Sequence, residues 1–364
     1  MKEVNAENQI SRFVLRGYKS IAECDLKLGR LNVLIGANGA GKSNFLGFFR
    51  IIFRIFNRQL QLAVAEMGGP DALLHFGRKR TEEMRAELCF GNNGYRFTLR
   101  PTGNNRMMFA PEEIWWNKRG DVHSESGHFE SCYVQKKFRF RFWKYVVPTM
   151  RSWRLYHFHD TSPSAWVKRV HGINDNEYLR DDARNLAAFL YRLKQYHAQH
   201  YDRIVWAIQL VAPFFGDFHL RPTVGNSEKI QLEWTEKGQD VPFPASALSD
   251  GTLRFICLAT VLLQPEEFMP AVILIDEPEL GLHPFAIAVL AEMMKSASQD
   301  RQLIVSTQSV ELVNEFDAED LIVADKQEQA TVLRRLDTED LSEWLGEYSL
   351  GELWKKNLLG GGPV

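Results

Sequence analysis

Eight residues near the start of the chain have the composition and spacing of a phosphate-binding loop. Residues 36–43 read Gly-Ala-Asn-Gly-Ala-Gly-Lys-Ser and directly follow the apolar run 31–35, which is typical of a buried strand. Glycines let the backbone turn tightly and aim its N–H groups at one point, and a helix beginning near Lys42 adds its positive end. An ordinary glycine turn is the alternative, and the strand before the loop argues against it.

This loop pattern assigns a task to each of its last two side chains. Lys42 is predicted to reach the β- and γ-phosphates of a nucleotide, and Ser43 is predicted to ligate Mg²⁺. The residues predicted to contact the nucleotide here are Gly36, Asn38, Gly39, Ala40, Gly41, Lys42, Ser43 and Asn44.

A pair of carboxylates follows a second apolar run, residues 271–275. A carboxylate at the carboxyl end of a buried strand lies where α/β sheets bind ligands. Asp276 is therefore predicted to hold Mg²⁺, directly or through water, and Glu277 to orient or deprotonate an attacking water molecule. A solvated turn or helix start is the alternative for two such acids, but the phosphate loop in the same chain favours the catalytic interpretation.

A third motif, Leu-Ser-Asp-Gly at residues 248–251, precedes the apolar stretch 253–263. Ser249 is predicted to cap the start of a helix. A serine hydroxyl beside the free N–H groups of a helix start forms a phosphate site of its own, so Ser249, Asp250 and Gly251 are predicted to contact a nucleotide. A capped helix with no phosphate to bind is the alternative.

These motifs together resemble those of a known family. Leu-Ser-Asp-Gly is similar to the Leu-Ser-Gly-Gly signature of ABC-type ATPases, and the order of loop, signature and Asp-Glu-Pro-Glu matches theirs. The opening at residues 16–21 and 31–36 resembles the SMC, RecF and OLD-like group. Residues 276–284 and 306–309 resemble compact, AAA-labelled ATPases of bacterial operons, which often accompany a nuclease or another effector and in many cases act against phage.

The resemblance implies a fold, a reaction and a partner. The expected fold is α/β, an ABC-type P-loop head with a mixed or parallel sheet, an N-terminal antiparallel lobe and a helical insert. The expected reaction is hydrolysis of ATP, with Mg²⁺, to ADP and phosphate. In such proteins the signature of one subunit closes on the nucleotide held by the other, which implies a homodimer or higher oligomer.

Two positions depart from the family pattern. Gln308 occupies the switch position, which is usually a histidine, and His283 stands roughly where an aspartate usually faces the partner subunit. Glutamine can hydrogen-bond a γ-phosphate or a water molecule but cannot titrate, so Gln308 is grouped with Lys42 and Glu277 as a catalytic residue and the speed of hydrolysis stays open. An ordinary polar residue at a strand end is the alternative for Gln308. A helix start before Pro284 is the alternative for His283.

Composition agrees with a globular protein. Of 364 residues, 45% are hydrophobic and 25% are charged, and the net charge of −2 gives no general attraction to nucleic acid or membranes. No apolar run approaches the length of a membrane span, and the polar residues 1–9 lack a signal-peptide core, so we expect a cytoplasmic protein without a membrane partner. The cysteines form no C-x-x-C pair, which indicates reduced thiols and argues against a zinc site. They are Cys24, Cys89, Cys132 and Cys257.

Periodicity and turn residues divide the chain into three predicted parts. Residues 1–125 are expected to hold the phosphate loop and antiparallel lobe, 126–245 a strand and helical insert, and 246–364 the rest of the head. Two or three strands are predicted over 11–35, a helix over 42–57, a break at 67–70 and a hairpin from 84–90 and 95–100. A strand pair is expected around 107–116, a polar loop over 120–127, two helices over 181–213, and strands over 218–224 and 230–235. Alternating strands and helices after 247 imply a parallel sheet.

Two stretches of the insert invite a binding hypothesis. Lys137, Arg139 and Arg141 alternate with phenylalanines, which in a strand would put the cations on one face, suitable for nucleic acid or an acidic protein. Rings in the core with cations in water are the favoured alternative. Histidines at 157 and 159 with Asp160 could ligate a metal, but with so few local ligands a structural strand near the nucleotide is preferred.

We therefore expect an ATPase that dimerises through bound nucleotide and controls a partner effector, a nuclease or toxin from the same operon, in anti-phage defence. A DNA repair or recombination ATPase of RecF or SMC type is one alternative. An ATP-bound scaffold with little turnover is another.

Overall fold

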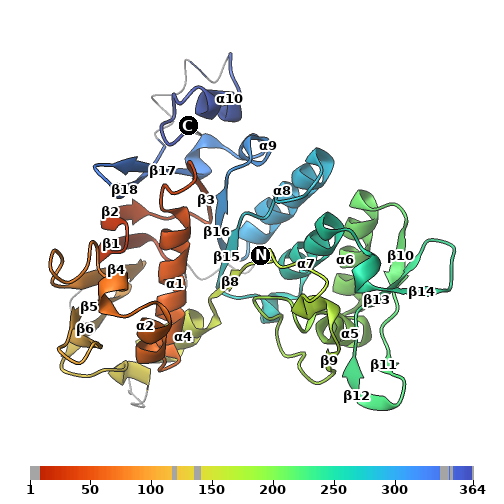
Figure 1. Ribbon diagram of the computed structural model, residues 1–364, viewed down its shortest axis with the longest axis horizontal. Helices are drawn as coiled ribbons and strands as arrows, with labels where there is room; N and C mark the ends of the chain where they lie inside the picture. The colour runs from red at the N-terminus through yellow and green to blue at the C-terminus, as the bar shows by residue number, and fades with distance from the viewer. Residues whose placement is uncertain (1–8, 117–120, 135–140, 337–343, 345–346, 363–364) are drawn as a thin grey trace. The chain divides into compact units, whose positions relative to one another are not determined.

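The computed structural model describes residues 9–116, 121–134, 141–336, 344 and 347–362, with the backbone alone for 121–123 and 141–146 (Figure 1). The chain forms two compact units. The first comprises Met1–Leu155, Pro270–Leu274 and Arg301–Val364, and the second comprises Tyr156–Met269 and Ile275–Asp300.

An antiparallel sheet forms one side of the first unit, in the order β2-β1-β4-β5-β6-β7. The chain folds back at residues 91 and 92 between β4 and β5, where Phe90 pairs with Asn93, so the predicted hairpin is confirmed. The bounds are β1 Arg12–Tyr18, β2 Ile21–Lys27, β4 Met84–Phe90, β5 Asn93–Pro101, β6 Met107–Trp116 and β7 Asp121–Glu125.

A second sheet of the first unit has the order β18-β17-β3-β16-β15-β8. Strand β3 pairs in parallel with β16 and β17, whereas β18 runs antiparallel to β17. Every residue of β3 is buried, and four of the five are apolar. The exception, Asn32, donates its side-chain amide to the carbonyls of Gly29, at 2.9 Å, and Leu303, at 3.1 Å. The parallel sheet expected after residue 247 is thus a mixed sheet. The bounds are β3 Leu31–Ile35, β8 Arg154–Tyr156, β15 Val272–Asp276, β16 Gln302–Thr307, β17 Leu321–Gln327 and β18 Ala330–Arg335.

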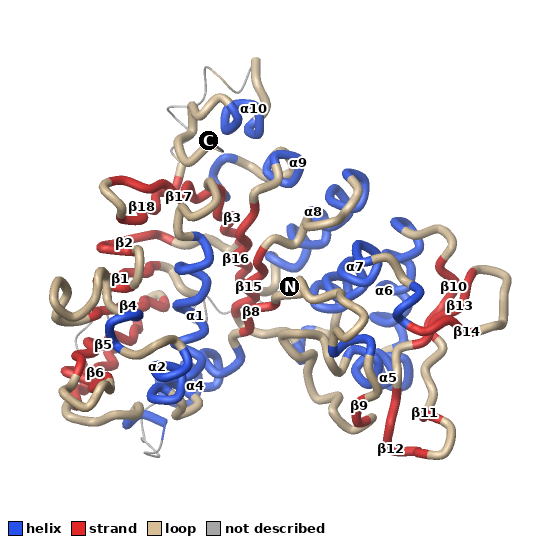
Figure 2. The backbone as a smooth tube through the Cα atoms, in the orientation of Figure 1, coloured by secondary structure: helices blue, strands red, loops and turns tan. Residues whose placement is uncertain are grey.

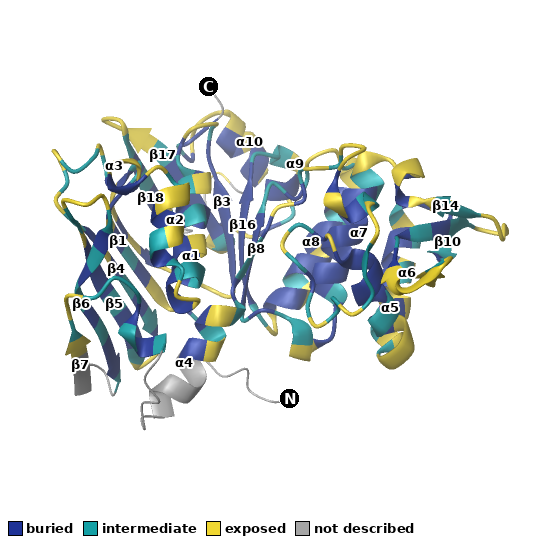
Figure 3. Ribbon diagram, turned by 60° about the horizontal axis from the view of Figure 1, so that its bottom comes forward, coloured by how far each residue is buried: buried dark blue, intermediate teal, exposed yellow. Residues whose placement is uncertain are grey.

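Helix α1, Lys42–Phe56, carries the main apolar face of the first unit, as predicted. Its rings pack on Phe13 of β1, whose centroid lies 5.2 Å from that of Phe45 and 5.3 Å from that of Phe49. Figure 3 shows strands β3 and β16 coloured as buried, whereas α1 also carries exposed and intermediate residues. Burying aromatic side chains of this size contributes roughly 2–3 kcal/mol each, so this core fixes the helix that follows the phosphate loop. Other helices of the unit are α2 Leu60–Glu66, α3 Pro70–Leu73, α4 Arg141–Ser152, α9 Val310–Val313 and α10 Leu350–Lys355.

The second unit contains helices α5 to α8 and two small sheets, which Figure 2 colours blue and red. Helix α7 is buried from Leu253 to Leu262, which accounts for its apolar sequence on all sides. The helices are α5 Leu186–Tyr196, α6 Ala198–Val211, α7 Asp250–Leu263 and α8 Pro284–Ser298. The small sheets have the orders β10-β13-β14 and β11-β12-β9. Their strands are β9 His171–Gly172, β10 Phe215–Phe218, β11 Pro222–Thr223, β12 Asn226–Ile230, β13 Glu233–Glu236 and β14 Pro242–Pro244.

Several sequence expectations are confirmed and others are wrong. Three strands lie within 11–35, the chain breaks between α2 and α3, and α5 and α6 are the two helices expected over 181–213. Residues 107–116 form one strand, β6, rather than a pair, and its partner β7 lies in the stretch expected to be a polar loop. Residues 218–224 and 230–235 form shorter strands than expected, because β11 pairs with β12 while β13 pairs with β10. Of the helices in the described ranges, none combines the length and apolar character needed to cross a membrane.

Candidate nucleotide-binding site

The phosphate loop connects β3 to α1 in the first unit. Lys42 is 5% exposed, and its Nζ donates to the carbonyls of Gly36, at 2.6 Å, and Ala37, at 3.1 Å. The ammonium group therefore lies over the loop in which the backbone N–H groups and the start of α1 are available to an anion.

Gly41 is required at the start of α1 by both conformation and space. Its φ is +106°, and a Cβ added there would lie 2.0 Å from Oγ1 of Thr331 in β18. The hydroxyl of Thr331 donates to Oγ of Ser20 at 2.8 Å, and the amide of Asn44 donates to the same oxygen at 2.6 Å. The turn between β1 and β2 and strand β18 thus fasten the first turn of α1. Sequence reasoning gave Ser20 and Thr331 no role, although Ser20 lies in the opening motif.

Gln308 follows β16 at the edge of the sheet from which the phosphate loop also departs. Thr307 pairs with Ile35, the residue before Gly36. The turn after β16 is held by the N–H of Ser309, which donates to Oγ1 of Thr307 at 2.9 Å. Within the first unit, the structure therefore brings the predicted switch residue and the phosphate loop to one end of two paired strands.

Asp276 and Glu277 lie where β15 carries the chain into the second unit. The Asp276 side chain is 12% exposed. Glu277 has a φ of +46°, a left-handed conformation that costs a residue with a side chain roughly 1–2 kcal/mol. The turn continues with the N–H of Leu280 donating to the Glu277 carbonyl at 3.3 Å.

Two histidines flank Asp276. Nδ1 of His157 lies 3.6 Å from Oδ2 of Asp276, and Nε2 of His159 lies 3.2 Å from its carbonyl oxygen. The two rings lie 3.9 Å apart. Asp160 turns to its own loop, where Oδ1 accepts from the N–H of Ser162 at 3.1 Å. Within the described residues, His157, His159 and Asp160 do not converge as a ligand set, so their metal hypothesis is not supported.

The signature motif begins α7 as predicted. Oγ of Ser249 accepts from the N–H of Thr252 at 3.2 Å, and both Ser249 and Asp250 are exposed. A Cβ on Gly251 would lie 2.3 Å from the carbonyl oxygen of Gly281, so the motif packs closely on the loop after Asp276. Nζ of Lys168 lies 3.9 Å from Oδ1 of Asp250.

Arg254 joins these parts of the second unit and was missed by sequence reasoning. It is 5% exposed, its Nε donates to the carbonyl of Phe158 at 2.9 Å, and its Nη1 donates to the carbonyl of Leu280. Burial lowers the pKa of Arg254. The presence of an arginine inside the apolar run 253–263 could have indicated that this side chain is buried and has polar partners. The guanidinium links the signature helix to the histidine segment and to the loop after Asp276.

The helix-start interpretation of His283 is confirmed. Its Nδ1 accepts from the N–H of Phe285 at 3.3 Å, and Pro284 occupies the first position of α8. Of the basic stripe, Lys137, Arg139 and the side chain of Arg141 lie outside the described residues. From Arg141 onward the backbone is helix α4, so the strand arrangement considered for the stripe does not extend to Arg141.

Comparisons with known proteins identify a family and a fold. A family model described as "AAA domain, putative AbiEii toxin, Type IV TA system" matches residues 31–314. No curated protein matches the sequence. A solved structure of an Smc head bound to the C-winged helix domain of ScpA is 17% identical, with a TM-score of 0.60 over 91% of this chain and 99% of that chain.

A second solved structure is an Smc head with an extended coiled coil, bound to the C-terminal domain of ScpA and derived from Pyrococcus furiosus. It is 15% identical, with a TM-score of 0.57 over 93% of this chain and 98% of that one. At these identities the likeness concerns the fold. It agrees with the expected ABC-type P-loop head of the SMC-like group.

Proposed function

Because this chain belongs to the AAA-domain family described for AbiEii toxin and type IV TA systems, and has the fold of an SMC-like P-loop ATPase, we propose that it binds and hydrolyses ATP. The observation that carries this proposal is the phosphate loop itself. Lys42 lies over a turn of glycines at the start of α1, and Gln308 leaves the neighbouring strand beside it.

In this proposal each motif has one task. The loop N–H groups and Lys42 bind the β- and γ-phosphates, while Ser43 and Asp276 hold Mg²⁺ through a hydroxyl and a carboxylate, the hard oxygen ligands that this ion prefers. Bound Mg²⁺ supplies neutralisation of phosphate charge. Glu277 orients or deprotonates the attacking water, and Gln308 hydrogen-bonds that water or the γ-phosphate.

The same proposal requires a second copy of the chain. Ser249 and Asp250 are exposed where α7 begins, and the Ser249 hydroxyl caps the N–H of Thr252 at 3.2 Å. The start of a helix, with its positive dipole end, favours an anion. We propose that Ser249, Asp250 and Gly251 contact the nucleotide bound to the loop of the partner copy. ATP then joins two subunits, and hydrolysis separates them.

Light scattering with ATP and Mg²⁺ tests both parts. We expect Glu277→Gln to bind ATP, to hydrolyse it at least about 100-fold more slowly and to accumulate as a dimer. Lys42→Ala should stay monomeric, and Ser249→Arg should bind ATP without dimerising. A wild-type protein that stays monomeric when saturated with a slowly hydrolysed ATP analogue contradicts the dimer. Equal, near-zero turnover of wild type and Glu277→Gln would instead indicate a scaffold.

The biological proposal is that the ATPase controls an effector encoded beside it, in defence against phage. The family description, with its reference to a toxin and a type IV TA system, supports this proposal. Expression with and without the neighbouring gene, followed by growth and plaque counts, tests it. A phenotype independent of both Lys42 and the neighbouring gene would argue against it.

A further inference from the structure

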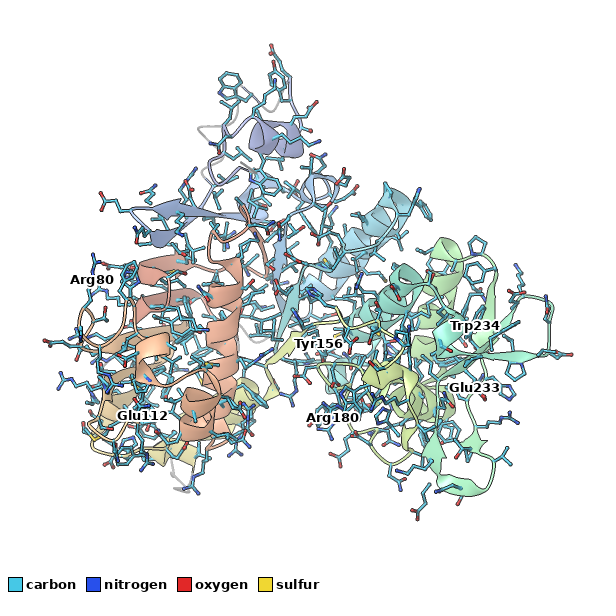
Figure 4. The ribbon with its side chains drawn as sticks, in the orientation of Figure 1. Arg80, Glu112, Tyr156, Arg180, Glu233 and Trp234 are labelled. Carbon is cyan, nitrogen blue, oxygen red and sulfur yellow. The ribbon has the colours of Figure 1, made fainter. Side chains whose placement is uncertain are left out.

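We propose that Glu112, His128 and Cys132 form a divalent-metal site of the zinc class in the antiparallel lobe, separate from the phosphate loop. One ligand atom from each side chain lies within 4.8 Å of the others. Figure 4 labels Glu112, which β6 carries in this lobe.

The Glu112 carboxylate divides its two oxygens between different neighbours. Oε1 accepts from the hydroxyls of Tyr95, at 2.8 Å, and Ser131, at 2.5 Å. Oε2 accepts from the N–H of Cys132 at 3.1 Å and also faces Nε2 of His128 at 2.7 Å and Sγ of Cys132 at 3.3 Å. The hydroxyls thus orient the carboxylate in the way that outer-shell partners orient a metal ligand, and the remaining oxygen points to an imidazole and a thiol.

Glu112 is a buried carboxylate, and its negative charge needs compensation. The residue is 0% exposed, and His128 is its one ion-pair partner among the residues that the structure describes. A buried carboxylate is costly unless a charged partner or a metal compensates it. A divalent ion held by a carboxylate and a thiolate, with neutral imidazole as the third ligand, gives a site without net charge.

The segment that carries His128 and Cys132 is held in place from several sides. The N–H of Gly127 donates to the Phe109 carbonyl and the N–H of Phe109 donates to the His128 carbonyl, both at 2.9 Å. The His128 ring stacks on Phe109, with centroids 4.8 Å apart. Nε2 of Gln61 donates to the Phe129 carbonyl at 2.6 Å. The ligands therefore need little ordering when an ion binds.

Ligand chemistry and spacing favour zinc over magnesium or calcium. Thiolate and imidazole are ligands of zinc and its neighbours in the first transition row, whereas magnesium and calcium take oxygen. Bonds of about 2.0–2.3 Å in a tetrahedron place ligand atoms roughly 3.3–3.8 Å apart. The separation of Sγ and Oε2 already meets the lower end of this range, and that of Nε2 and Oε2 must increase by roughly 0.6 Å or more to reach it. Binding releases the thiol proton to solvent.

Cobalt substitution tests the site in the full-length, untagged protein after treatment with a chelator. Wild type should bind one equivalent of Co²⁺ with a thiolate-to-cobalt charge-transfer absorption, which Zn²⁺ then removes. Cys132→Ser should abolish this absorption, and Glu112→Gln should weaken binding by about 10-fold or more. Circular dichroism establishes that each variant is folded.

Cys89→Ser is the matched control, because Cys89 is a half-buried thiol of the same sheet. It should keep the absorption, and so should Lys42→Ala, because the phosphate loop takes no part. The proposal is overturned if wild type shows no charge-transfer absorption, or if Cys132→Ser and Cys89→Ser change it equally.

Discussion

Thr307 of β16 lies opposite Ile35 of β3 in parallel register, so Gln308 and Gly36 leave the sheet at the same edge. This relationship places a residue that cannot titrate beside the predicted phosphate loop. In that position a glutamine amide can orient water or a γ-phosphate oxygen by hydrogen bonding.

Replacing Gln308 by alanine should therefore slow hydrolysis while leaving nucleotide binding intact. We expect kcat to fall roughly 10- to 100-fold and the affinity for ATP to change less than about 3-fold, since one hydrogen bond to the reacting groups is lost. Phosphate release and binding of a fluorescent ATP analogue measure the two effects. Gln327→Ala, at the exposed end of β17, is the control. An unchanged kcat in Gln308→Ala would remove Gln308 from the catalytic set.

Gly41 and Gly39 provide a matched pair within the phosphate loop. Both have positive φ, but a Cβ on Gly41 would collide with Thr331, whereas a Cβ on Gly39 would meet nothing within 4 Å. We expect Gly39→Ala to lower the free energy of unfolding by about 1 kcal/mol, from conformation alone, and Gly41→Ala to lower it by more than about 2 kcal/mol. Urea unfolding measures both.

The double variant Gly41→Ala/Thr331→Ala separates the collision from the conformation. It removes the Oγ1 and Cγ2 atoms of Thr331 that lie closest to the added Cβ. The double variant should therefore have a higher free energy of unfolding than Gly41→Ala alone. Equal losses in Gly39→Ala and Gly41→Ala would show that the contact with Thr331 does not constrain the loop.

The site could be predicted from sequence where its signals are local. Glycine spacing after an apolar run indicated the phosphate loop, and the Ser249 cap and the Pro284 helix start each depend on neighbours within a few residues. Ser20 and Thr331 could not be paired in this way, because 311 residues separate them in the chain. Their hydrogen bond exists because β18 and the turn after β1 meet in the folded unit.

Strand β7 and helix α4 show the limits of local pattern. Asp121–Glu125 is polar and resembles a loop, but pairing with β6 makes it a strand, since cross-strand hydrogen bonds outweigh weak intrinsic preference. Alternating charge and rings suggested a strand near Arg141, where the chain is helical. The error at β7 arises where tertiary contacts override local preference.

Replacing Arg254 should uncouple the signature helix from the loop after Asp276. Arg254→Met keeps the apolar length of the side chain but leaves the carbonyls of Phe158 and Leu280 without this donor. We expect a loss of about 2–4 kcal/mol in unfolding free energy, and slower turnover with little change in ATP affinity. Chemical unfolding and steady-state hydrolysis measure these effects. Arg203→Met, on the exposed face of α6, is the control and should change neither the unfolding free energy nor the turnover. Equal effects of the two variants would show that Arg254 does not link the signature helix to the loop after Asp276.

The cysteines should divide into two classes by reactivity. Burial raises the pKa of Cys24 to about 12 and that of Cys257 to about 12, whereas Cys89 and Cys132 are half-buried. At pH 8 a cysteine with such a raised pKa is a thiolate in only about one molecule in 10,000. Iodoacetamide should therefore modify Cys24 and Cys257 only after unfolding. Mass spectrometry of native and guanidinium-treated protein measures this. Rapid native labelling of Cys257 would contradict the buried position of α7.

Asp320, just before β17, gives a stability that depends on pH. Burial and the neighbouring Asp317 and Glu319 raise its pKa from 3.8 to about 6. Because the folded protein binds this proton more tightly than the unfolded chain, the stabilisation is complete below about pH 4 and is lost as pH rises to about 6. Asparagine does not ionise, so Asp320→Asn keeps its stability as pH rises. Its free energy of unfolding should exceed that of wild type by about 1–2 kcal/mol at pH 7, allowing for partial exposure, and equal that of wild type near pH 4. Urea midpoints from pH 4 to pH 7 measure the difference. Asp240→Asn, on an exposed loop, is the control, and its urea midpoints should follow those of wild type at every pH. If the midpoints of Asp320→Asn ran parallel to those of wild type from pH 4 to pH 7, Asp320 would be an ordinary surface carboxylate.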